Sequence, residues 1–218
     1  MRRTDPLRSE QEVNRFLNYM AGWNPTYYVA CCIGINWGLR ASDILALTVG
    51  DVLAGEGGRI QISDRIQIVE QKTGKLRDIP VTDKMKDILK IHLRMLKKRL
   101  DYSQTLPLIP SRKHDREGLC KAITRGHFSW IVGLAARRLG LARNGRCIAA
   151  HSLRKTYAFQ AWKNGTRVDE LQKEFGHSSV ETTHRYACIP SEQLDLIFTR
   201  VDFGNKRAFA EAPKVTSK

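Results

Sequence analysis

Four polar side chains in the C-terminal part of the chain stand in an order that suggests phosphoryl-transfer chemistry: His151, Arg154, His177 and Tyr186. His151 and Arg154 are three residues apart in a segment with helical apolar spacing, so both project from one face of a helix. An imidazole and a guanidinium placed in this way could both bind one phosphate. The segments that follow must then bring the other two groups to the same surface.

Two further helices are predicted to position His177 and Tyr186. Thr166 is the predicted N-cap of a helix that runs through Phe175, and His177 then lies on the turn after that helix. The S-x-x-E pattern that begins at Ser178 is a capping box, which predicts a short helix. This helix would carry the tyrosine about two turns from its start.

This segment resembles the catalytic domain of the tyrosine recombinase (phage integrase) family. The C-terminal signature of the family is His-x-x-Arg, then Gly-His near the end of a helix, then a tyrosine nine residues after that histidine. The corresponding residues here are His151 and Arg154, then Gly176 and His177, then Tyr186, in the same order and at the same spacing. Several residue types and several gaps agree at once, so the resemblance is specific.

Two motifs nearer the N-terminus carry the same resemblance. The segment GLRASDILAL resembles the family's first arginine motif, with Arg40 as its arginine and Asp43 in the acidic position that is expected to orient it. The segment QKTGKLRDIPV resembles the family's strand hairpin, with Lys72 as the catalytic lysine and Gln71 in place of the usual glycine. Spacing alone would favour a salt-bridged surface arginine, a helix-capping aspartate and a solvated hairpin tip.

The resemblance implies six catalytic residues around one scissile phosphate: Arg40, Lys72, His151, Arg154, His177 and Tyr186. In the roles that it implies, the tyrosine attacks the phosphorus to form a phosphotyrosyl intermediate, and the two arginines stabilise the charge that develops on the phosphate. His151 would act as the base, the lysine would protonate the departing 5′-oxygen, and His177 would hydrogen-bond the phosphate. Without the resemblance, a tyrosine on an amphipathic helix is more often a core or interface residue.

Apolar periodicity and capping signals predict an α+β fold that is mainly α-helical with a small three-stranded antiparallel sheet. The strands are expected between Gly57 and Val81, where β-branched residues alternate, and residues 101–123 are expected to form a loop. Four further helices are predicted to start at or beside these residues: Ser9, Pro25, Asp83 and Thr124. The first of them is expected to end at Gly22.

The chain has 218 residues, a formal net charge of +15 at pH 7 and an isoelectric point near 9.9. Such an excess attracts nucleic acids, because each neutralised phosphate releases counterions; a solvated basic surface is the alternative. The sequence has no apolar run of about 18 residues and no apolar stretch behind its basic N-terminus, so neither a membrane span nor a secretory signal is expected. The expected location is the cytoplasm, in association with the nucleoid.

Reduced, buried thiols are expected, because the number of cysteines is odd, most of them lie in apolar surroundings and no C-x-x-C pair occurs. The five residues are Cys31, Cys32, Cys120, Cys147 and Cys188. His177 and His184 lack a cysteine or carboxylate at ligand spacing, so neither a metal ion nor a cofactor is expected.

The resemblance spans almost the whole chain. Residues 1–203 are therefore expected to form one catalytic domain with no N-terminal core-binding domain evident, either as a short recombinase or as a fragment of a longer chain, followed by a basic, flexible tail at 204–218. The resemblance implies a site-specific recombinase that acts on double-stranded DNA with specific target sites, through a 3′-phosphotyrosyl intermediate and a Holliday junction. A homotetramer on DNA, exchange of a C-terminal helix at 192–203 between protomers and a helper protein are further expectations. Two alternatives stay open: DNA relaxation like that of a type IB topoisomerase, and a DNA-binding regulator that retains the fold.

Overall fold

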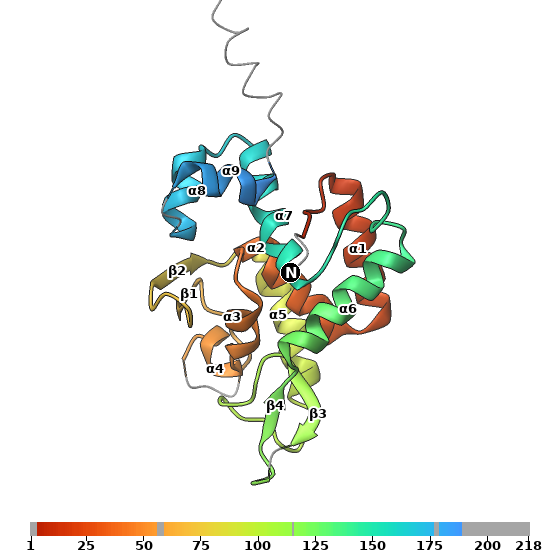
Figure 1. Cartoon of the computed structure of the whole chain (residues 1–218). Coiled ribbons are helices and arrows are strands. Elements are labelled where there is room, and N and C mark those ends of the chain that lie inside the picture. Colours follow the sequence, from red (N-terminus) through yellow and green to blue (C-terminus); the bar gives the residue numbers. More distant parts are fainter. Residues whose placement is uncertain (1–3, 56–58, 115, 177–178, 189–218) are drawn as a thin grey trace, which may run out of the picture. The chain divides into compact units, whose positions relative to one another are not determined.

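The computed structural model describes residues 4–55, 59–114, 116–176 and 179–188, all of which belong to the unit Met1–Cys188 (Figure 1). The helices are α1 (Glu10–Trp23), α2 (Pro25–Trp37), α3 (Ala41–Ala46), α4 (Val49–Val52), α5 (Asp83–Leu96), α6 (Arg125–Arg138), α7 (Ala150–Lys163), α8 (Val168–Phe175) and α9 (Val180–Ala187). The strands are β1 (Arg65–Val69), β2 (Leu76–Pro80), β3 (Pro110–His114) and β4 (Cys120–Ala122). The strand pairs are antiparallel, so the predicted class, mainly helical with a little antiparallel sheet, is confirmed.

Side-chain caps begin the first two helices as the sequence predicts. Ser9 caps α1, because its Oγ accepts a hydrogen bond from the backbone N–H of Glu12 at 3.1 Å. Helix α2 begins with Pro25 and is capped by Asn24, whose Oδ1 accepts hydrogen bonds from two backbone N–H groups. The expected end of α1 at Gly22 is wrong: this glycine lies within the helix, and the backbone becomes extended only at Asn24.

The caps of α5 and α6 are threonines. Thr124 caps α6, as predicted, by accepting a hydrogen bond from the backbone N–H of His127. The cap of α5 is Thr82, one residue before the predicted Asp83, and its hydroxyl accepts a hydrogen bond from the backbone N–H of Met85. Asp83 is therefore the first residue of the helix, where its negative charge complements the helix dipole.

Helices α8 and α9 begin beside the expected caps. The extended residue before α8 is Arg167, not Thr166, and the carboxylate of Glu170 accepts a hydrogen bond from its backbone N–H at 3.2 Å. Helix α9 is capped by Ser179, whose Oγ accepts a hydrogen bond from a backbone N–H at 3.2 Å. The expected cap, Ser178, lies outside the described residues.

The prediction of a three-stranded sheet is wrong. Strands β1 and β2 pair along their whole length as a two-stranded antiparallel sheet. Among the described residues, the expected third strand contributes an isolated bridge between Ile62 and Leu53. Ile62 is buried in the core, and backbone hydrogen bonds from Ala54 N–H to the Gln61 carbonyl and from Ser63 N–H to the Val52 carbonyl join this segment to residues 52–54 and not to β1 or β2.

The prediction of a loop over residues 101–123 is also wrong, because this stretch contains β3 and β4. The two strands pair as a second antiparallel sheet with an irregularity in its register. Their side chains are exposed or half-buried, so no alternation of apolar and polar residues marks them in the sequence.

Helix α7 packs against α2, α6, α8 and α9. Two glycines allow α2 to approach it closely: a Cβ on Gly34 would lie 2.9 Å from Cβ of Leu153, and a Cβ on Gly38 would lie 2.5 Å from Cδ1 of Tyr157. Gly38 also adopts the left-handed φ of 60° that ends α2. The turn after α2, which carries Arg40, is therefore held against α7.

Two general expectations concern the thiols and the membrane. All five cysteines are free thiols, as predicted, but the expectation that they are buried is wrong for Cys120, Cys147 and Cys188, which are half-buried. Cys31 and Cys32 are buried in the core, and burial raises the pKa of the Cys32 thiol to about 11, so it stays protonated near neutral pH. Within the part of the chain that the structure describes, no helix combines the length and the apolar character needed to cross a bilayer.

Candidate active site

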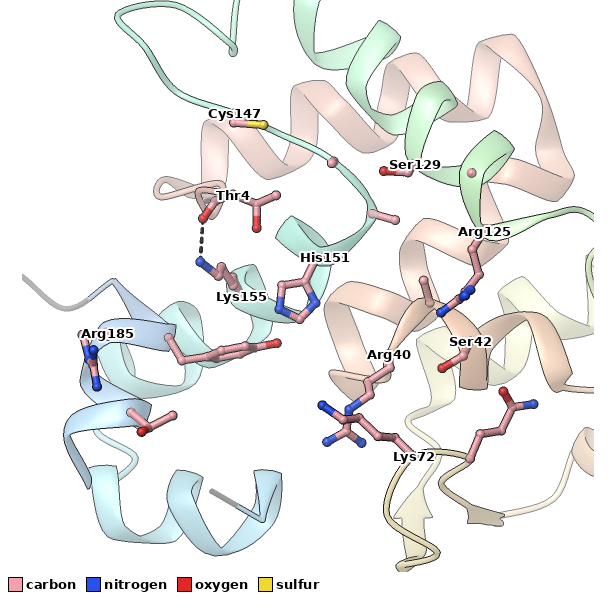
Figure 2. Close-up of a pocket in the computed structure, with 17 residues that line it drawn as sticks. Thr4, Arg40, Ser42, Lys72, Arg125, Ser129, Cys147, His151, Lys155 and Arg185 are labelled. Atoms are coloured by element: carbon pink, nitrogen blue, oxygen red, sulfur yellow. Dashed lines mark hydrogen bonds between the residues drawn. The ribbon is translucent and has the colours of Figure 1, made fainter. Parts of the chain in front are cut away.

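One open pocket of about 1410 Å³ collects side chains from distant parts of the chain (Figure 2). It is lined by the start of α3, the β1–β2 turn, the first turns of α6 and α7, and the end of α9. Among the described residues that line it, five are basic and none is acidic. The basic residues are Arg40, Lys72, Arg125, Lys155 and Arg185. Such a pocket favours an anionic ligand.

Four of the six predicted site residues line this pocket: Arg40, Lys72, His151 and Tyr186. In Figure 2 the side chains of Arg40, Lys72 and His151 reach into the same space. Arg154 does not line the pocket, because its side chain is only 2% exposed and lies within the protein interior. His177 lies outside the described residues.

Arg40 is presented from the turn between α2 and α3. Its backbone is extended, and its carbonyl accepts hydrogen bonds from the N–H groups of Asp43 and Ile44 in the first turn of α3. The expectation that Asp43 orients Arg40 is wrong, because the buried carboxylate of Asp43 accepts a hydrogen bond from the backbone N–H of Gln71 at 3.1 Å. Asp43 thus ties α3 to the β1–β2 turn, and the carboxylate that contacts Arg40 belongs to Glu70.

Lys72 lies in the turn between β1 and β2, where its side chain is exposed. Two backbone hydrogen bonds close this turn, from Glu70 N–H to the Lys75 carbonyl at 3.0 Å and from Gly74 N–H to the Glu70 carbonyl at 2.8 Å. The left-handed residue of the turn is Gly74, with φ 65°, whereas Gln71 has no positive φ. The glutamine that replaces the family's usual glycine therefore fits the turn without backbone strain.

Tyr186 lies near the end of α9 among aromatic and cationic groups. Its ring centroid is 5.2 Å from that of His151, in an edge-to-face arrangement, and 5.4 Å from that of Phe175. Burial raises the pKa of the Tyr186 phenol to about 12, although the nearby Arg154 guanidinium acts in the opposite direction. The phenol is therefore neutral near pH 7 and needs a proton acceptor before it can attack. The His151 ring is in contact with it.

Arg154 belongs to the most deeply buried side chains of the described residues. Its Nη1 lies 3.4 Å from Oε1 of Glu70, and its guanidinium carbon lies 4.5 Å from the ring centroid of Phe175. Burial lowers the pKa of Arg154, but an arginine still stays protonated. Its Nη2 is buried and has no hydrogen-bond partner among the described residues. A buried donor without a partner is costly, and the Tyr186 phenol lies close enough for the Arg154 guanidinium to act on its pKa.

The sequence-based prediction did not identify Glu70, although the alternation of buried residues along β1 points to it. Ile66 and Ile68 face the core at alternate positions of β1, and Glu70 is the next residue in that series. Its side chain is 1% exposed. The buried residue opposite Ile68 on β2 is Arg77, so the hairpin carries two charged residues, Glu70 directly after β1 and Arg77 on β2, where apolar ones are expected. Buried charges of this kind must be paired.

Three other basic residues of the pocket were also not predicted: Arg125, Lys155 and Arg185. Lys155 donates a hydrogen bond to the carbonyl of Thr4 at 2.6 Å (Figure 2), and its Nζ lies 5.7 Å from the Tyr186 ring centroid. It follows His151 by four residues, the spacing that places two side chains on one helix face. That spacing is the signal that could have found it.

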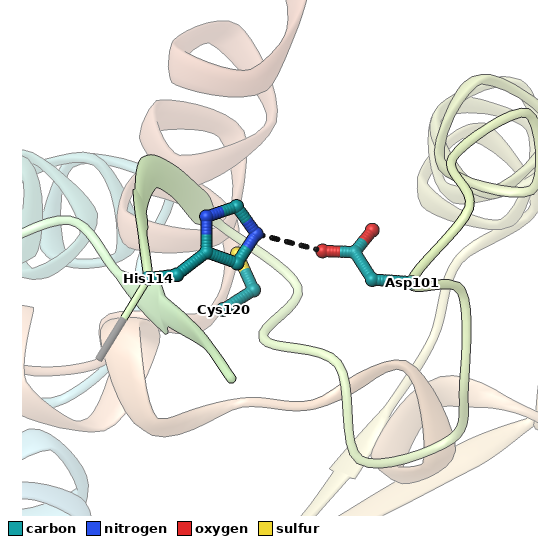
Figure 3. A group of neighbouring side chains, drawn as sticks. All are labelled: Asp101, His114 and Cys120. Carbon is teal, nitrogen blue, oxygen red and sulfur yellow. Dashed lines mark ion pairs between the residues drawn. The ribbon is translucent and has the colours of Figure 1, made fainter. Parts of the chain in front are cut away.

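A separate group of potential metal ligands consists of Asp101, His114 and Cys120 (Figure 3), whose ligand atoms lie within 4.8 Å of one another. His114 Nε2 is 3.5 Å from Oδ2 of Asp101. The guanidinium of Arg99 donates two hydrogen bonds to the Asp101 carboxylate, both at 2.7 Å, and its Nη2 is 3.6 Å from Sγ of Cys120. A cationic side chain thus already pairs with these groups, and a metal ion would have to displace it.

Comparisons with known proteins agree on one family. A sequence model described as the phage integrase family matches residues 8–193. The chain is 29% identical over 187 residues to the probable integrase/recombinase YoeC of Bacillus subtilis (strain 168), covering 86% of this chain and 91% of that protein. It is 27% identical over 168 residues to the tyrosine recombinase XerC of Thermodesulfovibrio yellowstonii, covering 75% of this chain and 50% of that protein. The chain spans about half the length of the XerC and XerD relatives that it matches.

Solved structures of recombinases share the fold. The match to XerA recombinase has a TM-score of 0.66 at 18% sequence identity and covers 94% of this chain and 68% of that chain. The match to the XerH site-specific recombinase bound to its difH substrate has a TM-score of 0.62 at 19% identity and covers 92% and 56%. The expected catalytic-domain fold is thereby confirmed.

Proposed function

The chain belongs to the phage integrase family, and on this premise we propose that it is a site-specific DNA recombinase. It cleaves and rejoins DNA strands at specific target sites through a 3′-phosphotyrosyl intermediate and a Holliday junction. The observation that supports the proposal is a single pocket lined by Arg40, Lys72, His151 and Tyr186. Among the described residues that line it, several are basic and none is acidic. A phosphodiester is the anion that this set of groups suits.

In the proposed cleavage step, the Tyr186 oxygen forms a bond to phosphorus while the bond from phosphorus to the 5′-oxygen breaks. His151 takes the proton of the phenol, and Lys72 gives a proton to the departing oxygen. The products are a 3′-phosphotyrosyl linkage and a free 5′-hydroxyl, so one phosphoester replaces another without an external energy source. Attack by the 5′-hydroxyl of a second strand reverses the step and rejoins the DNA.

The two arginines stabilise the charge of the transition state. A guanidinium keeps its charge at working pH and directs several N–H donors at phosphate oxygens. Arg40 lines the pocket, and the buried Nη2 of Arg154 has no hydrogen-bond partner among the described residues. Loss of one donor to a developing oxyanion typically slows a reaction by roughly 10²–10³. In this proposal His177 also hydrogen-bonds the phosphate.

The proposed partner is double-stranded DNA, in keeping with the net charge of +15. The XerH relative is described as bound to its difH substrate, and a λ integrase dimer as bound to a COC′ core site. We propose that residues 1–203 act as one catalytic domain on nucleoid DNA, in a homotetramer that exchanges the helix expected at 192–203. That helix lies outside the described residues, and a helper protein is part of the same proposal.

A nicked suicide substrate that carries candidate target sites tests the proposal. Cleavage beside the nick releases a short fragment, so the covalent protein–DNA adduct accumulates and can be counted on a denaturing gel. The unsubstituted protein should form the adduct, Tyr186→Phe should form none, and His177→Ala should form less. Absence of an adduct with every site would refute the proposed chemistry.

Two other outcomes would favour a different function. Relaxation of a supercoiled plasmid without any target site would indicate an activity like that of a type IB topoisomerase. Gene regulation that survives Tyr186→Phe would indicate a DNA-binding regulator that only retains the fold.

A further inference from the structure

We propose that Glu70 is a positioning residue that holds the guanidiniums of Arg40 and Arg154 in the arrangement needed to bind the scissile phosphate. The inference rests on the proposed function and adds to it a residue outside the six predicted ones. Glu70 does not line the pocket, and it acts through the two arginines.

The carboxylate of Glu70 lies between the two arginines. Oε2 is 2.5 Å from Nη1 of Arg40, and Oε1 is 3.4 Å from Nη1 of Arg154. The hydroxyl of Thr73 donates a third contact to Oε2 at 2.7 Å. The side chains of Glu70 and Arg154 are 1% and 2% exposed, so water cannot replace these contacts. One buried anion therefore connects an arginine before α3 with an arginine on α7.

A third guanidinium supports the carboxylate from the other strand. Nη1 of Arg77 is 3.9 Å from Oε1 of Glu70, and Nη2 of Arg77 is 2.6 Å from Oε1 of Glu174. Glu174 in turn accepts a hydrogen bond from the hydroxyl of Tyr157 at 2.9 Å. Since Glu174 lies on α8 and Tyr157 on α7, the position of Glu70 is set by contacts that join the hairpin to both helices.

Removal of the anion would leave like charges together in a buried place. Burial lowers the pKa of Arg154, and the positive charges of Arg40 and Arg77 lower it further, as expected of like charges held close together. Burial favours the protonated form of Glu70, but the Thr73 hydroxyl and the Arg40 guanidinium outweigh it, so the pKa of Glu70 is lowered and the carboxylate is charged near neutral pH. The anion therefore offsets the repulsion between the arginines.

Glu70 does not occupy every donor of the two arginines. A guanidinium has five N–H donors in a fixed plane, and Glu70 approaches each arginine at Nη1. Nη2 of Arg154 has no hydrogen-bond partner within the described ranges, and Arg40 remains 19% exposed at the pocket. Because a guanidinium is planar, holding one nitrogen restricts the direction of the others.

The same residue also connects the arginines with Lys72. Glu70 both donates and accepts the backbone hydrogen bonds that close the β1–β2 turn, and Lys72 lies within that turn. A displacement of Glu70 would thus move three of the predicted catalytic groups. Well-packed apolar residues often replace buried ion pairs without loss of stability. Stability alone therefore does not explain why a buried carboxylate lies beside these three groups.

The test compares Glu70→Gln with a matched control, Glu12→Gln. Glutamine keeps the size of the side chain and removes its charge. Glu12 also forms a short ion pair with an arginine, Arg146, at 2.6 Å, but neither residue lines the pocket. Two quantities are measured for each variant at one fixed salt concentration: the Kd for target DNA, and the single-turnover rate of adduct formation on the nicked substrate.

For Glu70→Gln we expect adduct formation to slow by roughly 10- to 100-fold, a part of the loss seen when a whole donor is removed. The Kd should stay the same or fall, because the site gains one positive charge. Glu12→Gln should leave both quantities within twofold. Slower cleavage together with equal or tighter binding is a result that general loss of structure cannot produce.

If Glu70→Gln forms the adduct within twofold of the rate of the unsubstituted protein, the inference about Glu70 is wrong while the proposed function stands. The same holds if the rate falls only in proportion to weaker DNA binding. Absence of an adduct from the unsubstituted protein would instead refute the proposed function, and the inference with it. If Glu70→Gln does not fold, Glu70→Asp decides, since it keeps the charge on a shorter side chain. A reduced rate at unchanged Kd supports positioning, and an unchanged rate overturns it.

Discussion

The close approach of α2 to α7 predicts a large effect of Gly38→Ala on both stability and cleavage. Gly38 has a φ of 60°, and a Cβ there would lie 2.5 Å from Cδ1 of Tyr157. The left-handed backbone costs an alanine about 1–2 kcal/mol, and overpacking typically costs about 1–3 kcal/mol more. The Tyr157 ring cannot move away freely, because its hydroxyl donates to both carboxylate oxygens of Glu174, at 2.9 and 3.1 Å.

Together these costs lower the free energy of unfolding by about 2–5 kcal/mol. For a chain of this size the Tm should fall by roughly 4–20 °C. Arg40 follows Gly38 by two residues, so a shift of the turn should also slow adduct formation on the nicked substrate. Thermal unfolding followed by circular dichroism, combined with the adduct assay, measures both effects.

The control for this prediction is Gly145→Ala. Gly145 also has a positive φ, 77°, but a Cβ there would meet no atom within 4 Å. It should therefore lose only the backbone contribution of about 1–2 kcal/mol. Equal Tm losses for Gly38→Ala and Gly145→Ala would refute the reasoning from close helix approach.

Three further predictions concern charge. Arg154→Lys should slow adduct formation by roughly 10²–10³, because an ammonium cannot replace the planar set of donors, whereas Arg65→Lys, on the exposed Arg65–Asp78 pair, should have little effect. The pKa of the Tyr186 phenol is raised to about 12 in the folded protein from its ordinary value of 10, so its contribution to stability is complete below pH 10 and is lost as the pH rises toward 12. Denaturant unfolding of Tyr186→Phe should therefore show a smaller loss of unfolding free energy between pH 10 and 12 than that of the unsubstituted protein. The affinity for DNA should fall linearly with salt on a double logarithmic plot, and Lys72→Ala should make the slope smaller by about one, whereas an unchanged slope would argue against contact between this lysine and a phosphate.

The sequence by itself determined the helices whose ends depend on nearby residues. The caps at Ser9 and Thr124 and the proline at the start of α2 use hydrogen bonds and conformations that span a few residues. The spacing of His151 and Arg154 likewise places two potential phosphate ligands on one helix face, whereas Tyr186 was identified only through the family resemblance. Signals of this kind are readable because they act over less than two helical turns.

Only the tertiary structure decided which strands pair and which charges meet. Ile60 and Ile62 alternate like residues of a strand, but their segment pairs with residues 52–54 outside the β1–β2 sheet, whereas β3 and β4 look like a loop because their side chains are exposed or half-buried. The carboxylate between the arginines proved to be Glu70, which is 84 residues from Arg154 in the chain, and Asp43, three residues from Arg40, binds a backbone N–H instead. An ion pair between a hairpin and a distant helix depends on how the elements pack, and no local pattern of residues encodes that distance.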